Sequence, residues 1–170
     1  VNLQKITTQM GVLVVAGPKS RDLLQKLTDT DMSKDNFKWL TGKSINVGYA
    51  QAEALRVNFV GELGWELHHP IEMQNYLFDL LVDAGAEYDM KLVGARAQNW
   101  LRQEKSYRAF VNELVRDATP AEADLPRFID LSKEFYGKLE MQAIGVRSKC
   151  VTLLIDGPED ADPWGREVLY

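Results

Sequence analysis

The stretch RVNFVGELGWELHHP, residues 56–70, constrains the fold more than any other part of the chain. Apolar and polar residues alternate on both sides of a glycine-bounded turn, GELG at residues 61–64, as in two half-buried strands. Such a turn joins antiparallel strands, so the segment predicts an antiparallel hairpin. Glu66 lies inside the second strand, between Trp65 and Leu67. A carboxylate at this place faces either water or a partner that needs an acceptor.

The segments on either side add further strands and helices. Short apolar or alternating runs predict strands, and apolar residues at helical spacing predict helices. The expected strands cover residues 12–16, 44–49, 55–59 and 65–68. The expected helices cover residues 18–27, 73–84 and 93–108. Residues 28–43 are polar and are expected to form mainly loop, anchored by Phe37, Trp39 and Leu40.

These elements predict an α+β fold, a mixed α/β domain with an antiparallel sheet and packed helices over residues 1–118. Asp117-Ala118-Thr119-Pro120 breaks the helical pattern, so a boundary is expected there. Val151, Leu153 and Ile155 alternate, and residues 119–170 are therefore expected to be a linker and the beginning of a β domain. The chain lacks an initial Met and closes on the beginning of a strand, so we expect it to be truncated at both ends.

Composition excludes several classes of function. The net charge of −5, without a long basic run, argues against binding to a nucleic-acid backbone or an anionic membrane. Cys150 is the only cysteine, so the chain cannot form an intramolecular disulfide and a reducing compartment fits best. No apolar run approaches the roughly 20 residues that span a bilayer. His68 and His69 are adjacent in a strand and point to opposite faces, so no metal site is expected.

Four motifs in order carry a resemblance to a known family. They are VGELGWEL at residues 60–67, LRQEKSYR at 101–108, TPAEADL at 119–125 and FYGK at 135–138. Together they resemble the folate-binding aminomethyltransferase family, which includes the T-protein of the glycine cleavage system and the C-terminal halves of dimethylglycine and sarcosine dehydrogenases. The EKxYR form of the second motif resembles the dehydrogenase branch.

The resemblance implies an α/β portion followed by the beginning of a truncated β-barrel domain at 119–170. It implies a tetrahydrofolate-dependent one-carbon transfer enzyme that acts with folate, a small methylated amine and the remaining domains of a longer protein. FAD is expected only in a domain outside this chain. The family's catalytic aspartate lies upstream of the first strand, so no catalytic residue is expected here and the chain alone should have little turnover. The expected location is cytoplasmic, or the mitochondrial matrix in a eukaryote.

The resemblance also implies folate-binding residues. A pterin presents an exocyclic amino group beside a ring N–H, and a carboxylate matches these two parallel donors with charge-assisted hydrogen bonds. Glu66 matches the family glutamate that holds the pterin, although a solvent-facing strand residue is the alternative. Phe59 is expected beside the folate, with a core position as the alternative. Tyr107 and Arg108 are expected to line the same cavity, with packing and surface roles as the alternative. Glu62 is expected to stabilise the turn.

The sequence departs from the family pattern at one position, and three alternative functions remain open. Where T-proteins carry an arginine that assists pterin binding, this chain has Gln98, which fits the dehydrogenase branch. A folate-dependent demethylase of the same family is one alternative. A non-catalytic folate-binding accessory protein of the iron–sulfur assembly type is another, although residues 135–138 lack its signature cysteine. A small α/β interaction module without a ligand is the third.

Overall fold

The computed structural model describes residues 1–110, 112–154 and 156–158. The contacts within the chain divide it into two compact units, residues 1–99 and residues 100–170. We call these the N-terminal unit and the C-terminal unit and describe each by itself. The expected domain boundary after residue 118 stays a prediction.

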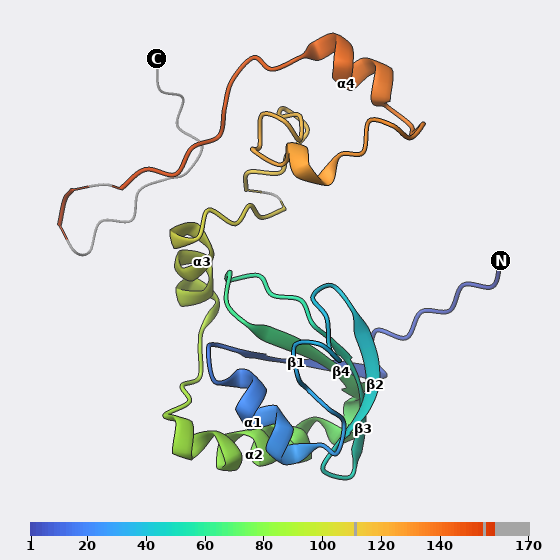
Figure 1. The fold of residues 1–170 in the computed structure, drawn as a ribbon, viewed down its shortest axis with the longest axis vertical. Helices are drawn as coiled ribbons and strands as arrows, with labels where there is room; N and C mark the ends of the chain where they lie inside the picture. Colours follow the sequence, from blue (N-terminus) through green and yellow to red (C-terminus); the bar gives the residue numbers. More distant parts are fainter. Residues whose placement is uncertain (111, 155, 159–170) are drawn as a thin grey trace. The chain divides into compact units, whose positions relative to one another are not determined.

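The N-terminal unit is built on a four-stranded antiparallel sheet in the order β1-β4-β3-β2 (Figure 1). The strands are β1 Met10–Ala16, β2 Gly42–Val47, β3 Ala50–Leu55 and β4 Gly64–Pro70. β4 is an interior strand, and Ala16 of β1 lies opposite its first residue, Gly64. The strands expected near residues 12–16, 44–49 and 65–68 are thus confirmed, with bounds that differ by a few residues.

β3 pairs antiparallel with β4, which confirms the expected hairpin partners, but residues 56–63 join the two strands in place of the expected tight turn. The tight hairpin of this sheet joins β2 to β3. Val47 pairs with Ala50 across a two-residue loop in which Gly48 has a φ of +59°. Such a loop favours glycine because a side chain is strained at positive φ. The strand expected over 55–59 ends at Leu55 instead. The amide of Val57 bonds the carbonyl of Leu55, two residues earlier, at 2.9 Å, so the chain turns at Arg56 and the extended strand ends.

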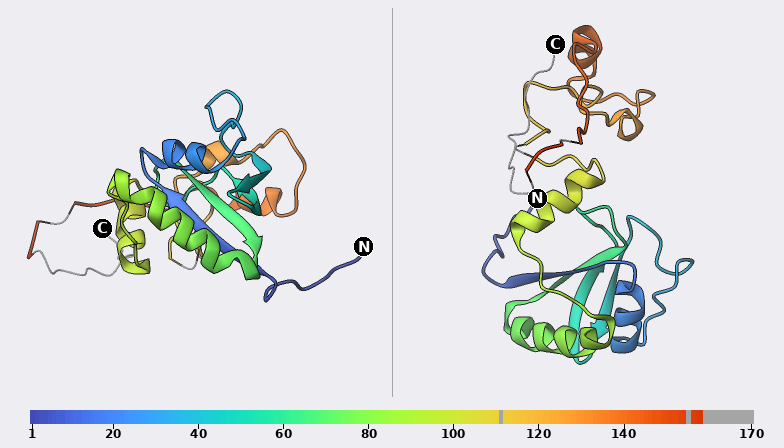
Figure 2. Two further views of the ribbon diagram at one scale, coloured as in Figure 1. Left: turned by 90° about the horizontal axis from the view of Figure 1, so that it is seen from below. Right: turned by 90° about the vertical axis from the view of Figure 1, so that its left-hand side faces the viewer.

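Two helices cover one face of this sheet (Figure 2). They are α1 Ser20–Leu27 and α2 Gln74–Gly85, which confirm two of the expected helices. Short 3₁₀ turns, η1 Ile71–Met73 and η2 Ala86–Tyr88, precede and follow α2. Leu24 and Leu77 are fully buried where the helices pack against the sheet.

The strands contribute alternate residues to this core. On β4, Trp65 and Leu67 are buried, and on β3 Ala50, Ala52 and Ala54 are buried. The alternation follows from the two-residue period of a strand. The core therefore lies between one sheet face and the two helices.

The loop between α1 and β2 is anchored differently from our expectation. Phe37 is fully buried, as expected, and meets Trp65 edge-on at 5.9 Å between ring centroids. Trp39 and Leu40 are exposed, so their expected anchoring role is wrong. Phe37 already fills the space beside Trp65, and Leu40 has a positive φ of 59° that places it in a turn.

The third helix, α3 Ala95–Glu104, is shorter than the expected helix over 93–108. It ends because Ser106 adopts a left-handed φ of 59°. The amides of Ser106 and Tyr107 then bond the carbonyls of Gln103 and Arg102 at 2.9 and 2.8 Å. This is the Schellman pattern of a helix C-terminus. Tyr107 therefore lies beyond the helix rather than on it.

The C-terminal unit has little regular structure after α3. It contains the 3₁₀ turn η3 Pro126–Phe128 and the helix α4 Lys138–Ile144. Residues 151–154 carry no strand, so the strand expected over 151–155 is wrong for the part that the structure describes. A strand needs a neighbour to satisfy its backbone, and no strand among the described residues pairs with residues 151–154. Ile155 and residues 166–170, where strand positions were also expected, lie outside the described residues, and the beginning of a barrel is not shown.

Candidate functional site

Glu66 lies in the middle of β4, on the sheet face opposite to α1 and α2. Its partners in the neighbouring strands are Val14 of β1 and Leu55 of β3. The Glu66 side chain is 34% exposed, and Val14 beside it is 54% exposed. The carboxylate is thus neither buried in the core nor surrounded by bulk solvent. It stands on a partly apolar surface that the strands form.

Trp65 fixes the direction in which Glu66 points. The indole is fully buried, and the guanidinium groups of Arg21 and Arg56 lie over it, 5.3 and 5.9 Å from its centroid. Burial and the neighbouring Arg21 charge lower the pKa of Arg56. Because adjacent residues of a strand point to opposite faces, an anchored Trp65 directs Glu66 to the open face.

Gly64 lets β4 begin close to β1. A Cβ atom on Gly64 would lie 2.9 Å from the carbonyl oxygen of Val15 and 3.1 Å from Cα of Ala16. Both are backbone atoms that cannot rotate away. Glycine at this position of the GELGWE segment therefore permits the pairing that places Glu66 beside Val14.

His68 is the partner of Glu66 that the sequence analysis missed. Its Nε2 lies 3.0 Å from Oε2 of Glu66, and both side chains are about one-third exposed, at 33% and 34%. The signal was present in the sequence, because residues two apart in a strand share a face. Glu53 of β3 and Val12 of β1 flank His68 in register. The open face therefore carries two carboxylates and an imidazole beside two valines.

Phe59 lies in the irregular segment 56–63 that connects β3 to β4, within the same unit as Glu66. Its side chain is 40% exposed. This exposure contradicts the alternative of a core phenylalanine on a strand. Glu62 belongs to the same segment and is half-buried. The folate role of Phe59 stays a prediction.

Tyr107 and Arg108 lie in the C-terminal unit. The Arg108 guanidinium donates to the carbonyls of Ala123 and Cys150 at 3.3 and 3.1 Å, and to the hydroxyl of Thr152 at 3.3 Å. These bonds match the packing role that the sequence left open for Arg108. The Tyr107 side chain is 38% exposed. A folate role for either residue stays a prediction.

Buried charges hold the segment around Tyr107. The Arg102 side chain is only 2% exposed, and its Nη1 donates to Tyr107 O at 2.8 Å and to Glu113 at 2.9 Å. The same Glu113 oxygen accepts the amide of Ala109 at 2.8 Å. The LRQEKSYR motif contains Arg102, but nothing in the sequence identified Glu113 as its partner.

A second buried carboxylate, Glu122, was also missed. Its side chain is 1% exposed and accepts the Thr119 amide at 2.7 Å and both the amide and Nε of Arg147 at 2.9 Å. The Arg147 guanidinium, followed by the Thr119 amide, holds the pKa of Glu122 well below its ordinary range. The Thr-x-x-Glu spacing of a capping box, residues 119–122, was the available signal.

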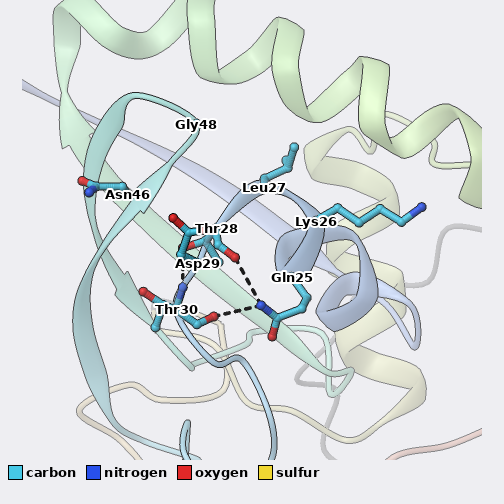
Figure 3. Close-up of a pocket in the computed structure, with 8 residues that line it drawn as sticks. All are labelled: Gln25, Lys26, Leu27, Thr28, Asp29, Thr30, Asn46 and Gly48. Atoms are coloured by element: carbon cyan, nitrogen blue, oxygen red, sulfur yellow. Dashed lines mark hydrogen bonds between the residues drawn. The ribbon is translucent and has the colours of Figure 1, made fainter.

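A pocket of about 410 Å³ lies elsewhere in the N-terminal unit, lined by residues 25–30, Asn46 and Gly48 (Figure 3). The Gln25 amide bridges the carbonyls of Thr28 and Thr30 at 3.2 and 3.0 Å. None of the expected folate-site residues lines this pocket. Gln25, Thr28 and Thr30 bond one another directly after the last turn of α1, which braces this helix end.

Two further properties concern only the part of the chain that the structure describes. There, no group of three or more His, Cys, Asp and Glu side chains is placed to hold a metal ion. Within the same residues, no helix has the length and apolar character needed to cross a bilayer.

Comparison with known proteins confirms the resemblance. The family of the GCVT N-terminal domain matches residues 1–133. Mitochondrial dimethylglycine dehydrogenase of Homo sapiens is 41% identical over 177 residues, which cover 100% of this chain and 20% of that protein. Mitochondrial sarcosine dehydrogenase of Mus musculus is 34% identical, covering 99% of this chain and 19% of that protein. The aminomethyltransferase of Caldanaerobacter subterraneus subsp. tengcongensis is 32% identical, covering 89% of this chain and 41% of that protein.

The chain thus spans about a fifth of the length of the two dehydrogenases. A solved structure, the heterotetrameric sarcosine oxidase from Corynebacterium sp. U-96 in complex with pyrrole 2-carboxylate, aligns with a TM-score of 0.46 and 19% identity over 52% of this chain and 44% of that chain. The sequence relationships are the informative ones. The family match covers residues 1–133, and both dehydrogenases align along nearly the whole chain. This chain therefore belongs to the GCVT N-terminal domain family.

Proposed function

We propose that this chain provides the tetrahydrofolate-binding surface of a one-carbon transfer enzyme, in which Glu66 accepts the paired N–H donors of the pterin. The observation that carries the proposal is the placement of the Glu66 carboxylate. It stands half-exposed on an interior strand, on the face that the core does not use, beside Val14 and Leu55. The names of the relatives, dimethylglycine dehydrogenase, sarcosine dehydrogenase and aminomethyltransferase, support the same class of chemistry.

The residues on this face fit such a ligand. A flat heterocycle needs an acceptor for its two donors and apolar surface for its ring, and Glu66 and Val14 supply these side by side. The half-exposed Phe59 adds an aromatic ring from the same unit. When bound, tetrahydrofolate supplies the nitrogen atoms that take up the one-carbon unit. The chain's own contribution is to bind and orient, which is catalysis by positioning.

The finer parts of the proposal concern the whole enzyme. We propose a small methylated amine as the source of the carbon and a flavin, held by a separate domain, as the oxidant. We also propose that Tyr107 and Arg108 take part in folate binding. For a eukaryotic source, we propose the mitochondrial matrix as the location, because the dehydrogenase relatives are named mitochondrial.

The test is the substitution Glu66→Gln. Glutamine would place an amide donor against one of the two pterin donors and remove the charge. Hydrogen bonds to charged groups contribute about 1.5–3 kcal/mol, so we expect the Kd for tetrahydrofolate to rise roughly 10- to 100-fold. The measurement is isothermal titration of the full chain with tetrahydrofolate under anaerobic conditions.

Glu72→Gln is the matched control, since it removes the same charge from an exposed residue of η1. The control should bind as the unchanged chain does. Equal affinity of the unchanged chain and Glu66→Gln, or no binding by the unchanged chain, would overturn the proposal.

A further inference from the structure

We propose that His68 is a positioning residue that sets the orientation of the Glu66 carboxylate before a ligand arrives. This inference rests on the proposed function and deepens it. The two side chains project from the same face of β4, with Nε2 of His68 3.0 Å from Oε2 of Glu66. Both are about one-third exposed, so the pair is reachable from outside.

The chemistry of the pair fixes a tautomer. An ionised carboxylate only accepts hydrogen bonds, so Nε2 of His68 must carry the proton that it donates to Glu66. This bond occupies one acceptor position of Oε2. The other positions on Oε2, together with Oε1, remain to receive two parallel N–H donors. His68 therefore orients the Glu66 carboxylate and leaves it able to accept two further hydrogen bonds.

The surroundings of His68 keep the imidazole in place. Across the strands it lies between Val12 of β1 and Glu53 of β3, while its own strand supplies Glu66 two residues earlier. Glu53 and Glu66 are the titratable groups in register beside His68 on this face. Helices α1 and α2 pack on the opposite face, so they present no charge to it. Of the two carboxylates, Glu66 is the one that His68 bonds.

The benefit for binding is preorganisation. A free glutamate side chain populates several rotamers, and a ligand that selects one of them pays for the loss of freedom. With His68 in place, that ordering is complete before the ligand binds. The bond also blocks the side of Glu66 toward residue 68. A heterocycle is therefore directed to the side of Val14 and Leu55, where the sheet is apolar.

Two substitutions of the same residue test the inference. His68→Phe keeps a ring but removes the donor, and we expect the Kd of the full chain for tetrahydrofolate to rise about tenfold. His68→Gln places an amide N–H near the position of Nε2, and we expect it to retain affinity within about twofold of the unchanged chain. Far-UV circular dichroism and the urea midpoint of each variant establish that both are folded. A merely structural role would not be rescued selectively by glutamine.

A second measurement needs no folate. The ¹⁵N resonances of the His68 imidazole should show the Nε2–H tautomer in the unchanged chain, and a larger share of the Nδ1–H tautomer in Glu66→Ala, which removes the acceptor. Unchanged affinity of His68→Phe, with Glu66→Gln weakened, would overturn the positioning role and leave the proposed function standing. Equal affinity of the unchanged chain and Glu66→Gln would instead overturn the proposed function. The same tautomer of His68 in the unchanged chain and in Glu66→Ala would show that the two residues are not bonded, and would overturn the positioning role.

Discussion

The two units of this chain are held together by different forces. In the N-terminal unit, leucines, valines, alanines, Phe37 and Trp65 form one apolar core between a sheet and two helices. In the described part of the C-terminal unit, the buried hydrophobic residues are Ala109 and Ala123, which are small. The large buried side chains there are charged, namely Arg102 and Glu122. One unit therefore depends on burial of apolar surface, and the other on buried ion pairs.

This difference indicates which unit can hold a binding site rigid when pH or salt concentration changes. Hydrophobic burial depends little on pH or salt near neutrality, whereas ion pairs respond to both. Glu66 and His68 project from a strand whose opposite face is the apolar core. A binding group on such a scaffold keeps its geometry better than one carried by a loop.

The largest expected effect is the loss of core packing in the N-terminal unit. Leu77→Ala removes a fully buried side chain of α2 and should cost about 2–5 kcal/mol of unfolding free energy. The measurement is urea unfolding combined with amide hydrogen exchange of the β4 residues. Leu139→Ala is the control, because Leu139 is 75% exposed on α4 and should change stability by less than about 0.5 kcal/mol. Similar costs for the two substitutions would break the comparison between the units.

The next effect concerns acid stability of the C-terminal unit. Arg147 and Thr119 lower the pKa of Glu122 in the folded chain, so its ionised form favours folding at pH values above the ordinary pKa of 4.5. This contribution should be lost progressively as the pH falls below 4.5. Glu122→Gln cannot ionise, and its unfolding midpoint should therefore vary less with pH in that range. The measurement is the amide hydrogen exchange of residues 119–125 at several pH values, which reports the local stability around Glu122 in the unchanged chain and in Glu122→Gln.

Glu140→Gln serves as the control for the acid experiment, since Glu140 is exposed on α4. It should keep the pH dependence of the unchanged chain. A pH profile of Glu122→Gln that matches the unchanged chain would show that the buried carboxylate is not what holds the C-terminal unit.

The smallest expected effect is a gain in stability at the end of α3. Ser106 has a φ of 59°, a conformation that costs other residues more than glycine. Ser106→Gly should therefore stabilise the C-terminal unit by up to about 1 kcal/mol, measured by urea unfolding. Ser106→Ala, which keeps the strained Cβ, should give no such gain. A loss of stability in Ser106→Gly would mean that the serine side chain contributes more than the strain costs.

The sequence predicted the strand β1, the helices α1 and α2, and the family, because each rests on a local pattern. The continuous apolar run of β1 did not indicate that β1 lies at the sheet edge with Val12 and Val14 exposed. It missed most of β3, whose residues Ala50–Leu55 are weak strand formers. Their alternation was visible, with Ala50, Ala52 and Ala54 buried between exposed Gln51 and Glu53. The strand conformation of these small residues is stabilised by pairing with the neighbouring strands β2 and β4, and not by their own β propensity.

The candidate site was predicted only as single residues. The local pattern singled out Glu66 as a carboxylate within a strand, and the family resemblance implied its folate role. The bond to His68 was not predicted, because it depends on how two side chains orient on a folded sheet. The helix over 93–108 was expected to continue because its apolar spacing continues, whereas the left-handed Ser106 ends it. Tyr107 and Arg108 therefore lie beyond the helix end. The partners of Arg108, which are Ala123, Cys150 and Thr152, could not be predicted from local sequence because they are distant along the chain.

The back-to-back placement of Trp65 and Glu66 also limits which insertions this chain can tolerate. One extra residue placed between Gly64 and Trp65 would exchange the two faces of the rest of β4. The Trp65 indole would then point to the open face, and the Glu66 carboxylate would point into the apolar core. Two extra residues would restore the alternation. Insertions that change strand length by odd numbers should therefore be selected against here far more strongly than even ones.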